Sequence, residues 1–161
     1  LAVPDGAEVV FIGQVETQNP IRAFFPPGSR TPMHASGTGK AILAALPEDR
    51  LMALLKGAGL KGFTEETLIT PRALFDDLAE TRARGWSFDR NERYDGMSCI
   101  GAAIFNDRGE PCAGVSISGP SSRFRDAQIA EFGAAVAHAA EQITHLIAGK
   151  GVAISETAGL R

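Results

Sequence analysis

The sequence has no long apolar run and very little cysteine. Its longest uninterrupted apolar stretch is residues 41–46, whereas a membrane span needs roughly 18 residues, and the first residues lack the charged-then-apolar pattern of a secretory signal. Cys99 and Cys112 are the two cysteines, with no CxxC motif or Cys/His cluster typical of zinc. We therefore expect a cytoplasmic protein with reduced thiols, no membrane contact, no metal and no cofactor.

An excess of positive charge is also missing. The chain has 16 Lys and Arg against 19 Asp and Glu, for a formal net charge of −3, so we do not expect it to bind nucleic acid by itself. A length of 161 residues is typical of one domain with a single core. The chain opens without an initiator Met on turn-and-strand sequence, and we expect it to be a piece of a longer protein.

Hydrophobic periodicity predicts an α+β domain with a mostly antiparallel sheet. The expected strands span residues 8–16, 21–25, 86–90, 97–105 and 112–119. The expected helices begin after Ser36, at Pro47, at Pro71 and between residues 122 and 126, the last ending near residue 146. A turn at residues 106–109 makes the last two strands a hairpin, across which the long final helix packs.

Small residues lead into the first helix in the stretch HASGTGKA, residues 34–41. A Walker A motif would need Gly where His34 stands and Ser or Thr where Ala41 stands, so the match fails twice. The amides around Gly37 and Thr38 would still attract an anion, because they stand at a helix N-terminus. The alternative is a tight loop in which glycine allows close packing against the sheet.

The period of two along a strand separates the side chains of the hairpin onto two faces. Val115 and Ile117 are expected in the core, and Ser116 and Ser118 point to the other side. If the Cys99 side of the preceding strand meets the serines, one thiol and two hydroxyls converge. Alternatively, the serines face water.

Two other chemical interpretations of Cys99 remain open. As a nucleophile it would need a base, for which His34 is the upstream candidate. As a cysteine within an apolar strand, it would be a small buried hydrophobic residue, which is the commoner role.

Two charged groups elsewhere are interpreted as surface features. His138, Glu141 and His145 follow one another at metal-compatible spacing on the last helix, but a solvated helix face explains them better. Glu92 and Arg93 are expected to form a surface charge cluster of small energetic value.

Residues 85–106 have the spacing Gly-x3-Asp-x2-Glu-x6-Cys-Ile-Gly-x2-Ile-Phe-Asn, which resembles the signature of the IclR family of bacterial transcriptional regulators. Its fixed positions are Gly85, Asp89, Glu92, Cys99, Ile100, Gly101, Ile104, Phe105 and Asn106. The likeness extends through the glycine loop upstream and SISGP downstream, over roughly residues 32–149. It implies a GAF-like (profilin-like) effector-binding domain over residues 1–149, followed by a tail at residues 150–161.

The resemblance also implies partners. Family members carry an N-terminal winged helix-turn-helix domain, which is absent from this chain, so DNA would be contacted only through a domain outside it. They form homodimers or homotetramers and respond to small carboxylate effectors. On this basis the chain is a sensor and not an enzyme.

In detail the chain resembles the branch of the family that senses short oxoacids, glyoxylate first and pyruvate next. The ligand contacts that this resemblance implies are Gly37, Thr38, Asp89, Cys99, Ser116 and Ser118. Trp86, Phe88 and Met97 would supply apolar walls. A sensor tuned to aromatic acids and a small Cys-dependent enzyme are the alternatives.

Asp89 is the residue that fits least easily. At 4 Å and an effective dielectric constant near 20, an ionised Asp89 would repel a ligand carboxylate by roughly 4 kcal/mol. Either the carboxylate points towards the loop amides, or Asp89 is protonated or accepts a hydroxyl. We hypothesise that it accepts a hydrogen bond from the hydrated aldehyde of glyoxylate, with Ser116 and Ser118 assisting.

Overall fold

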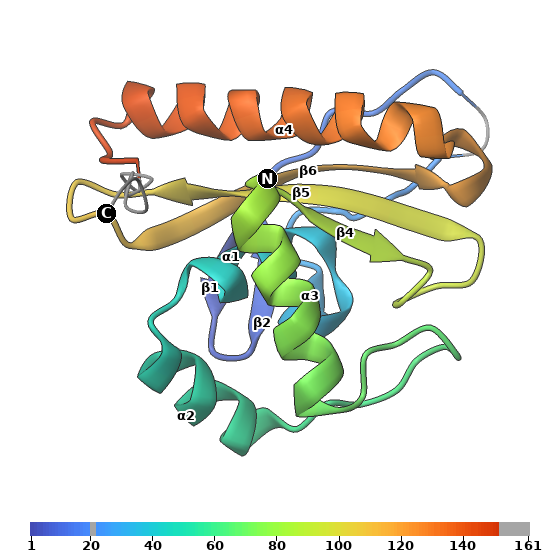
Figure 1. Ribbon diagram of the computed structural model, residues 1–161. Helices are drawn as coiled ribbons and strands as arrows, with labels where there is room; N and C mark the ends of the chain where they lie inside the picture. Colours follow the sequence, from blue (N-terminus) through green and yellow to red (C-terminus); the bar gives the residue numbers. More distant parts are fainter. Residues whose placement is uncertain (20–21, 152–161) are drawn as a thin grey trace, which may run out of the picture.

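The computed structural model describes residues 1–19 and 22–151, which form six strands, four α-helices and two short 3-10 helices (Figure 1). The strands are β1 (Ala2–Asp5), β2 (Glu8–Phe11), β3 (Arg30–Pro32), β4 (Ser87–Arg90), β5 (Met97–Phe105) and β6 (Pro111–Pro120). The helices are η1 (Met33–Ala35), α1 (Gly37–Ala45), α2 (Glu48–Ala58), α3 (Pro71–Arg84), η2 (Ser121–Arg123) and α4 (Asp126–Leu146). The expected α+β class is confirmed.

All six strands belong to one antiparallel sheet with the order β3-β2-β1-β6-β5-β4. The start of the chain therefore lies at the centre of the sheet, where Ala2 of β1 pairs with Gly114 of β6. The hairpin of β5 and β6 is the one expected from the sequence, with Asn106 at its turn accepting hydrogen bonds from the amides of Arg108 and Glu110.

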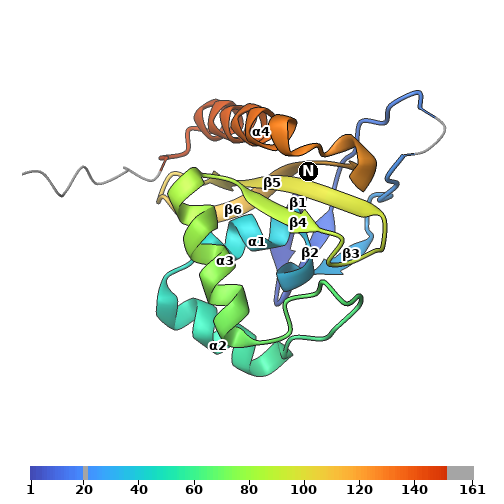
Figure 2. The same cartoon turned by 45° about the vertical axis from the view of Figure 1, so that its right-hand side comes forward.

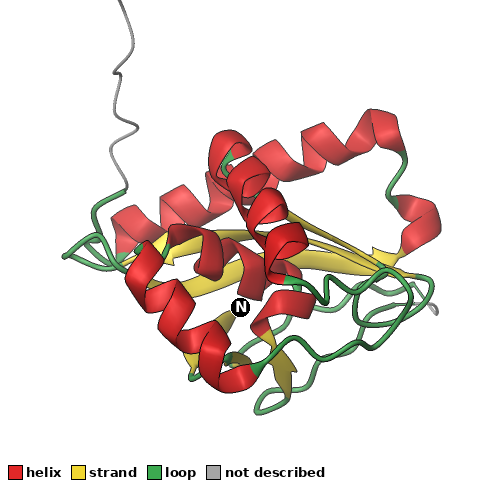
Figure 3. Ribbon diagram, turned by 60° about the horizontal axis from the view of Figure 1, so that its bottom comes forward, coloured by secondary structure: helices red, strands yellow, loops and turns green. Residues whose placement is uncertain are grey.

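Helices cover both faces of the sheet, with α4 on one face and α1 and α3 on the other (Figures 1 and 2). Helix α2 lies on the same side as α1 and α3, farther from the strands (Figures 1 and 2), and Figure 3 shows helices on both sides of the strands. Ile100 and Ile104 of β5 pack towards α4, in a cluster with Val136 and Ala140. Ala102 lies in the same cluster, and the alternate residues Gly101 and Ala103 therefore face α1.

The helix ends follow the capping rules used to predict them. The Ser36 hydroxyl accepts a hydrogen bond from the amide of Gly39 at the start of α1, and the Thr70 hydroxyl accepts one from Ala73 at the start of α3. Gly85 ends α3 with φ of 83°, a left-handed conformation that glycine adopts without strain.

The N-terminal strands differ from the sequence prediction. Strand β2 stops at Phe11 instead of Glu16, and residues 22–25 form no strand, while residues 20 and 21 lie outside the described residues. The segment is held by a side chain, because Gln14 accepts a hydrogen bond from the amide of Phe25 and donates one to Ala23. Strands β1 and β3 were not predicted, since both are short and contain proline.

One residue of β6 that was expected in the core is exposed. Ile117 shares the α4 side of β6 with Val115 but is 40% exposed, because α4 packs mainly over β5. The expectation that this face of β6 is core is therefore wrong at Ile117.

Of the tail expected at residues 150–161, residues 152–161 lie outside the described residues.

The start of α1 lies directly against β5 because two glycines face each other. A Cβ atom on Gly37 would stand 2.7 Å from the Cys99 Sγ atom, and one on Gly101 would overlap the backbone of Gly37. The hydroxyl of Ser87 on β4 donates a hydrogen bond to the carbonyl of Gly37. Glycine therefore permits the close packing that the tight-loop interpretation expects, and this packing brings the first turn of α1 against the sheet.

We predict that Gly101→Ala destabilises the protein by about 1–3 kcal/mol, because the added methyl group meets backbone that cannot yield. Gly57→Ala in α2 is the matched control, since a Cβ there meets nothing within 4 Å and alanine favours a helix by up to about 1 kcal/mol. The free energy of unfolding from urea titration measures both. Equal effects of the two substitutions would contradict the prediction.

Candidate ligand-binding site

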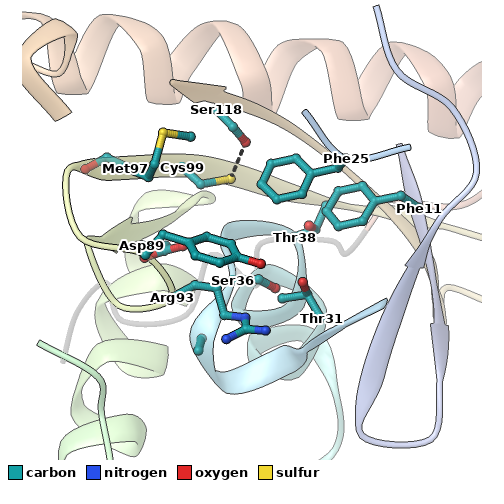
Figure 4. Close-up of a pocket in the computed structure, with 13 residues that line it drawn as sticks. Phe11, Phe25, Thr31, Ser36, Thr38, Asp89, Arg93, Met97, Cys99 and Ser118 are labelled. Atoms are coloured by element: carbon teal, nitrogen blue, oxygen red, sulfur yellow. Dashed lines mark hydrogen bonds between the residues drawn. The ribbon is translucent and has the colours of Figure 1, made fainter. Parts of the chain in front are cut away.

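A small cavity lies between the first turn of α1, strands β4, β5 and β6, and the loop that joins β4 to β5 (Figure 4). Its volume is about 20 Å³, counted as space open to the centre of a water molecule, which is room for roughly one or two waters. It is lined by Phe11, Phe25, Thr31, Ala35, Ser36, Thr38, Asp89, Arg93, Tyr94, Met97, Ser98, Cys99 and Ser118. The lining is polar towards α1 and the sheet, and aromatic towards β2.

Four of the six residues singled out from the sequence line this cavity: Thr38, Asp89, Cys99 and Ser118. They converge because Cys99 pairs with both Asp89 of β4 and Ser118 of β6 across the ladder. Gly37 and Ser116 do not line the cavity. Gly37 packs on Cys99, and Ser116 lies opposite Gly101 in the neighbouring strand.

The first turn of α1 brings polar groups close to the cavity, and the backbone of Gly37 hydrogen-bonds to Cys99. The hydroxyl of Ser36 accepts a hydrogen bond from the Gly39 amide, and its carbonyl accepts one from the Lys40 amide. The amides of Gly37 and Thr38 have no partner within the helix. The Thr38 side chain is fully buried, and its hydroxyl has no hydrogen-bond partner among the described residues. An unpaired buried hydroxyl costs about 1–3 kcal/mol, which a ligand that bonds to it would recover.

The thiol of Cys99 is a neutral polar contact. The Ser118 hydroxyl donates to its Sγ atom at 3.0 Å. Burial, together with the charge of Asp89, raises the pKa of Cys99, and the hydroxyls of Ser118 and Ser116 oppose the rise only in part. His34, the candidate base, instead places its Nε2 atom 2.9 Å from the carbonyl oxygen of Lys61 and does not line the cavity. This geometry lacks the thiolate–imidazole pair of a cysteine nucleophile.

Asp89 titrates close to neutral pH. Burial raises its pKa to about 6, and the charge of Asp77 adds to the rise. A hydrogen bond of 2.8 Å from the Glu92 amide to Oδ1 and the charges of Lys40 and Arg93 oppose it. The protonated form considered for Asp89 is therefore accessible at a moderate pH.

Glu92 is not a surface residue, and the expectation of a surface charge cluster is wrong. Its carboxylate accepts a hydrogen bond of 2.6 Å from Lys40, which is fully buried. The same ammonium donates to the Phe88 carbonyl at 2.6 Å and lies 3.1 Å from Asp77. Burial raises the pKa of Glu92 to about 7, and Lys40 opposes that rise. Arg93, the other member of the expected cluster, lines the cavity.

Lys40 was missed as a structural residue, although the sequence holds a clue. It is the one charged residue in the nine residues of α1, which are otherwise small or apolar. A helix of that composition is buried on most sides, so a cation within it must find buried partners. The partners themselves are far away in sequence.

The apolar walls were predicted only in part. Met97 lines the cavity, but Trp86 and Phe88 pack towards α4, where the Trp86 ring fills the space beside Gly133. Phe88 precedes Asp89 on a strand and so points to the opposite face. The aromatic wall comes instead from Phe11 and Phe25, whose rings stack at 4.8 Å.

The histidines of α4 are solvated, as expected. His138 and His145 each stand 3.9 Å from Glu141, and all three side chains are about two-thirds exposed. Across residues 1–19 and 22–151, no group of three metal-ligating side chains is close enough to hold an ion. In the same ranges, no helix has the length and hydropathy of a membrane span.

A small cavity between the first turn of a helix and an antiparallel sheet, lined by aromatic and polar side chains, is typical of a small-molecule-binding domain. The family model described as "Bacterial transcriptional regulator IclR C-terminal" matches residues 1–145, and the chain belongs to this family. The expectation drawn from residues 85–106 is thereby confirmed.

Relatives support the assignment in sequence and in structure. HTH-type transcriptional regulator BhcR of Paracoccus denitrificans is 48% identical over 145 residues, covering 89% of this chain and 52% of that protein. The crystal structure of Thermotoga maritima IclR has a TM-score of 0.87 at 35% identity, covering 91% of this chain and 60% of the other. The chain spans about half the length of the curated relatives it matches.

A more distant structure shares the fold alone. The inducer-binding domain of a PobR double mutant from Acinetobacter, in complex with 3-hydroxybenzoic acid, has a TM-score of 0.79 at 22% identity. The alignment covers 90% of this chain and 86% of that one.

We predict that Lys40→Met destabilises the protein by about 3–5 kcal/mol near pH 7, because Glu92 and Asp77 lose the cation between them. The loss should be smaller near pH 5, where Glu92 is protonated. Lys56→Met, on the exposed side of α2, is the control and should change stability by less than about 0.5 kcal/mol. Urea unfolding at both pH values measures the difference, and a pH-independent loss would contradict the role given to Glu92.

A second prediction concerns Asp89. Because its folded pKa of about 6 exceeds the ordinary value of 3.8, its contribution to stability is greatest below about pH 4 and is lost as the pH rises through 6. Asp89→Asn cannot ionise but keeps an oxygen for the Glu92 amide. As the pH is raised from 4 to 8, the free energy of unfolding of Asp89→Asn should therefore rise by about 1–3 kcal/mol relative to that of the wild type. Asp95 is exposed in the loop that follows β4. In the same measurements, the difference in unfolding free energy between Asp95→Asn and the wild type should not change with pH.

Proposed function

We propose that the chain is the ligand-sensing domain of a bacterial transcriptional regulator and that its effector is a short 2-oxoacid, glyoxylate in preference to pyruvate. The observation that carries the proposal is the cavity beside the start of α1, which combines small size with the unpartnered hydroxyl of Thr38. A ligand of a few heavy atoms suits such a space, with small outward movements of the lining side chains.

The chemistry of the walls suggests an orientation for the ligand. The carboxylate would lie towards the amides of Gly37 and Thr38, where the helix dipole favours negative charge. The oxo group, or its hydrate, would lie towards Asp89, Cys99 and Ser118. Asp89 would accept a hydrogen bond from a hydrate hydroxyl, and its carboxylate would point away from that of the ligand.

Ser116 enters this proposal as a supporting residue. It lies on the same face of β6 as Ser118, and its hydroxyl acts on the pKa of Cys99. In this role it would orient the thiol that the ligand meets. The chain would act as a sensor without turnover.

In the whole regulator, the domain over residues 1–149 would be preceded by a winged helix-turn-helix domain that contacts DNA in the cytoplasm. The regulator would be a homodimer or homotetramer. The effector alters DNA binding only to the extent that it binds one subunit arrangement more tightly than another.

An aromatic acid is the second candidate effector, favoured by one observation. The stacked rings of Phe11 and Phe25 form one wall, and a pair of rings that moved apart could enclose a third. The PobR domain, of similar fold, is in complex with 3-hydroxybenzoic acid. The volume of about 20 Å³ favours the smaller ligand.

Thermal unfolding of the chain with glyoxylate, pyruvate and 3-hydroxybenzoate tests the proposal. At 100 times its dissociation constant, a ligand adds about 2.7 kcal/mol to stability. We expect this gain with glyoxylate at the lowest concentration, with pyruvate next. A gain with 3-hydroxybenzoate alone would favour the second candidate, and no gain with any acid would refute both.

The role of Asp89 has its own outcome in the same titrations. We expect Asp89→Asn to weaken glyoxylate binding by about 10-fold, the value of one hydrogen bond to a charged acceptor. Asp95→Asn is the matched control and should bind as the wild type does. Unchanged or tighter binding to Asp89→Asn would remove the acceptor role while leaving the oxoacid proposal intact.

A further inference from the structure

Arg93 is the one cationic side chain among the residues that line the cavity. It stands in the loop between β4 and β5, and its guanidinium carbon lies 4.0 Å from the ring centre of Phe63 and 4.8 Å from that of Tyr94. Figure 4 shows the guanidinium on the side of Ser36 and Thr31, across from Cys99 and Ser118. Two rings thus fix the orientation of the cation beside the cavity.

The hydrogen-bonding capacity of Arg93 is not used within the described part of the chain. Its Nε atom is buried without a hydrogen-bond partner, and the Arg93 side chain takes part in none of the ion pairs there. Nearby Arg90, in contrast, has a side chain that is 60% exposed and pairs with Asp126 at 3.9 Å. A buried donor without an acceptor destabilises the protein. A ligand whose acceptor atom forms a hydrogen bond with this donor would therefore bind more favourably.

The other buried cation near the site is already occupied. The ammonium of Lys40 donates hydrogen bonds to the Phe88 carbonyl and to Glu92, and it lies 3.1 Å from Asp77 as an ion pair. It cannot turn towards a ligand without leaving a buried carboxylate unpaired. Arg93 is therefore the cation that remains free to meet an incoming anion.

We propose that Arg93 is a specificity-determining residue of the cavity, whose guanidinium receives the carboxylate of the effector and selects acids over uncharged carbonyl compounds. This rests on the proposed function. A carboxylate that leaves water needs a countercharge and hydrogen bonds, and a planar guanidinium supplies both in a fork that matches it. Because the cavity is so small, a ligand that fills it reaches both Arg93 and the first turn of α1.

The test compares glyoxylate binding to the 161-residue chain and to three variants by isothermal titration calorimetry. Arg93→Gln removes the charge, and Arg93→Lys keeps the charge without the planar guanidinium. Arg90→Gln, at the last residue of β4, is the matched control. We expect Arg93→Gln to raise the dissociation constant by about 10- to 100-fold and Arg93→Lys by less. Arg90→Gln should stay within about 2-fold of the wild type.

Packing and charge are separated by a second neutral variant. Arg93→Met keeps an apolar stem against Phe63 and Tyr94, so its comparison with Arg93→Lys holds even if Arg93→Gln does not fold. Tighter binding to Arg93→Lys than to Arg93→Met supports the proposal. Equal binding to these two variants would overturn it, since only packing would then matter.

The remaining outcomes separate this proposal from the function on which it rests. A wild-type chain that binds glyoxylate no better than Arg93→Gln would refute the role of Arg93 and leave the oxoacid sensor standing. A wild-type chain that binds neither glyoxylate nor pyruvate would refute both. Glycolaldehyde, which lacks the carboxylate, should bind wild type and Arg93→Gln alike, and a loss comparable to that of glyoxylate would count against selection by charge.

Discussion

The buried ammonium of Lys40 holds three parts of the molecule in one arrangement. Through single contacts it joins α1 to Phe88 of β4, to Glu92 in the following loop and to Asp77 on α3. A charge without exposure is stable only if all its partners stay in place. This one cation therefore links the loop and α3 to α1, beside the apolar packing of Leu74 and Leu78 on Ile42 and Leu43.

The cavity is a consequence of that arrangement. The loop held by Glu92 also carries Arg93, and the Glu92 amide donates to Asp89 inside the cavity. On the opposite side, the glycines at 37 and 101 let α1 approach β5, which brings Thr38 against the strands. One wall is thus fixed by electrostatics and the other by the absence of side chains.

Part of the cavity lining follows local rules, although Asp89 was singled out by the resemblance to the family. The alternation along β4, β5 and β6 places Asp89, Cys99 and Ser118 on one face, and the ladder then pairs them. The cap at Ser36 predicted where the amides of α1 are exposed. The aromatic wall was not predictable, because Phe25 reaches Phe11 through a loop held by Gln14, and loops carry no periodicity.

The sequence by itself determined the α+β class, the hairpin of β5 and β6, the starts of α1 and α3, and the family, because these depend on periodicity, capping and spacing within short stretches. Tertiary structure alone decided which buried charges meet. Glu92 and Arg93 have the composition of a solvated surface, and only the approach of Lys40, 52 residues from Glu92 in the chain, gives Glu92 its buried partner. The composition of α1 indicates that Lys40 is buried, but its partners come from distant segments, so no local pattern identifies them.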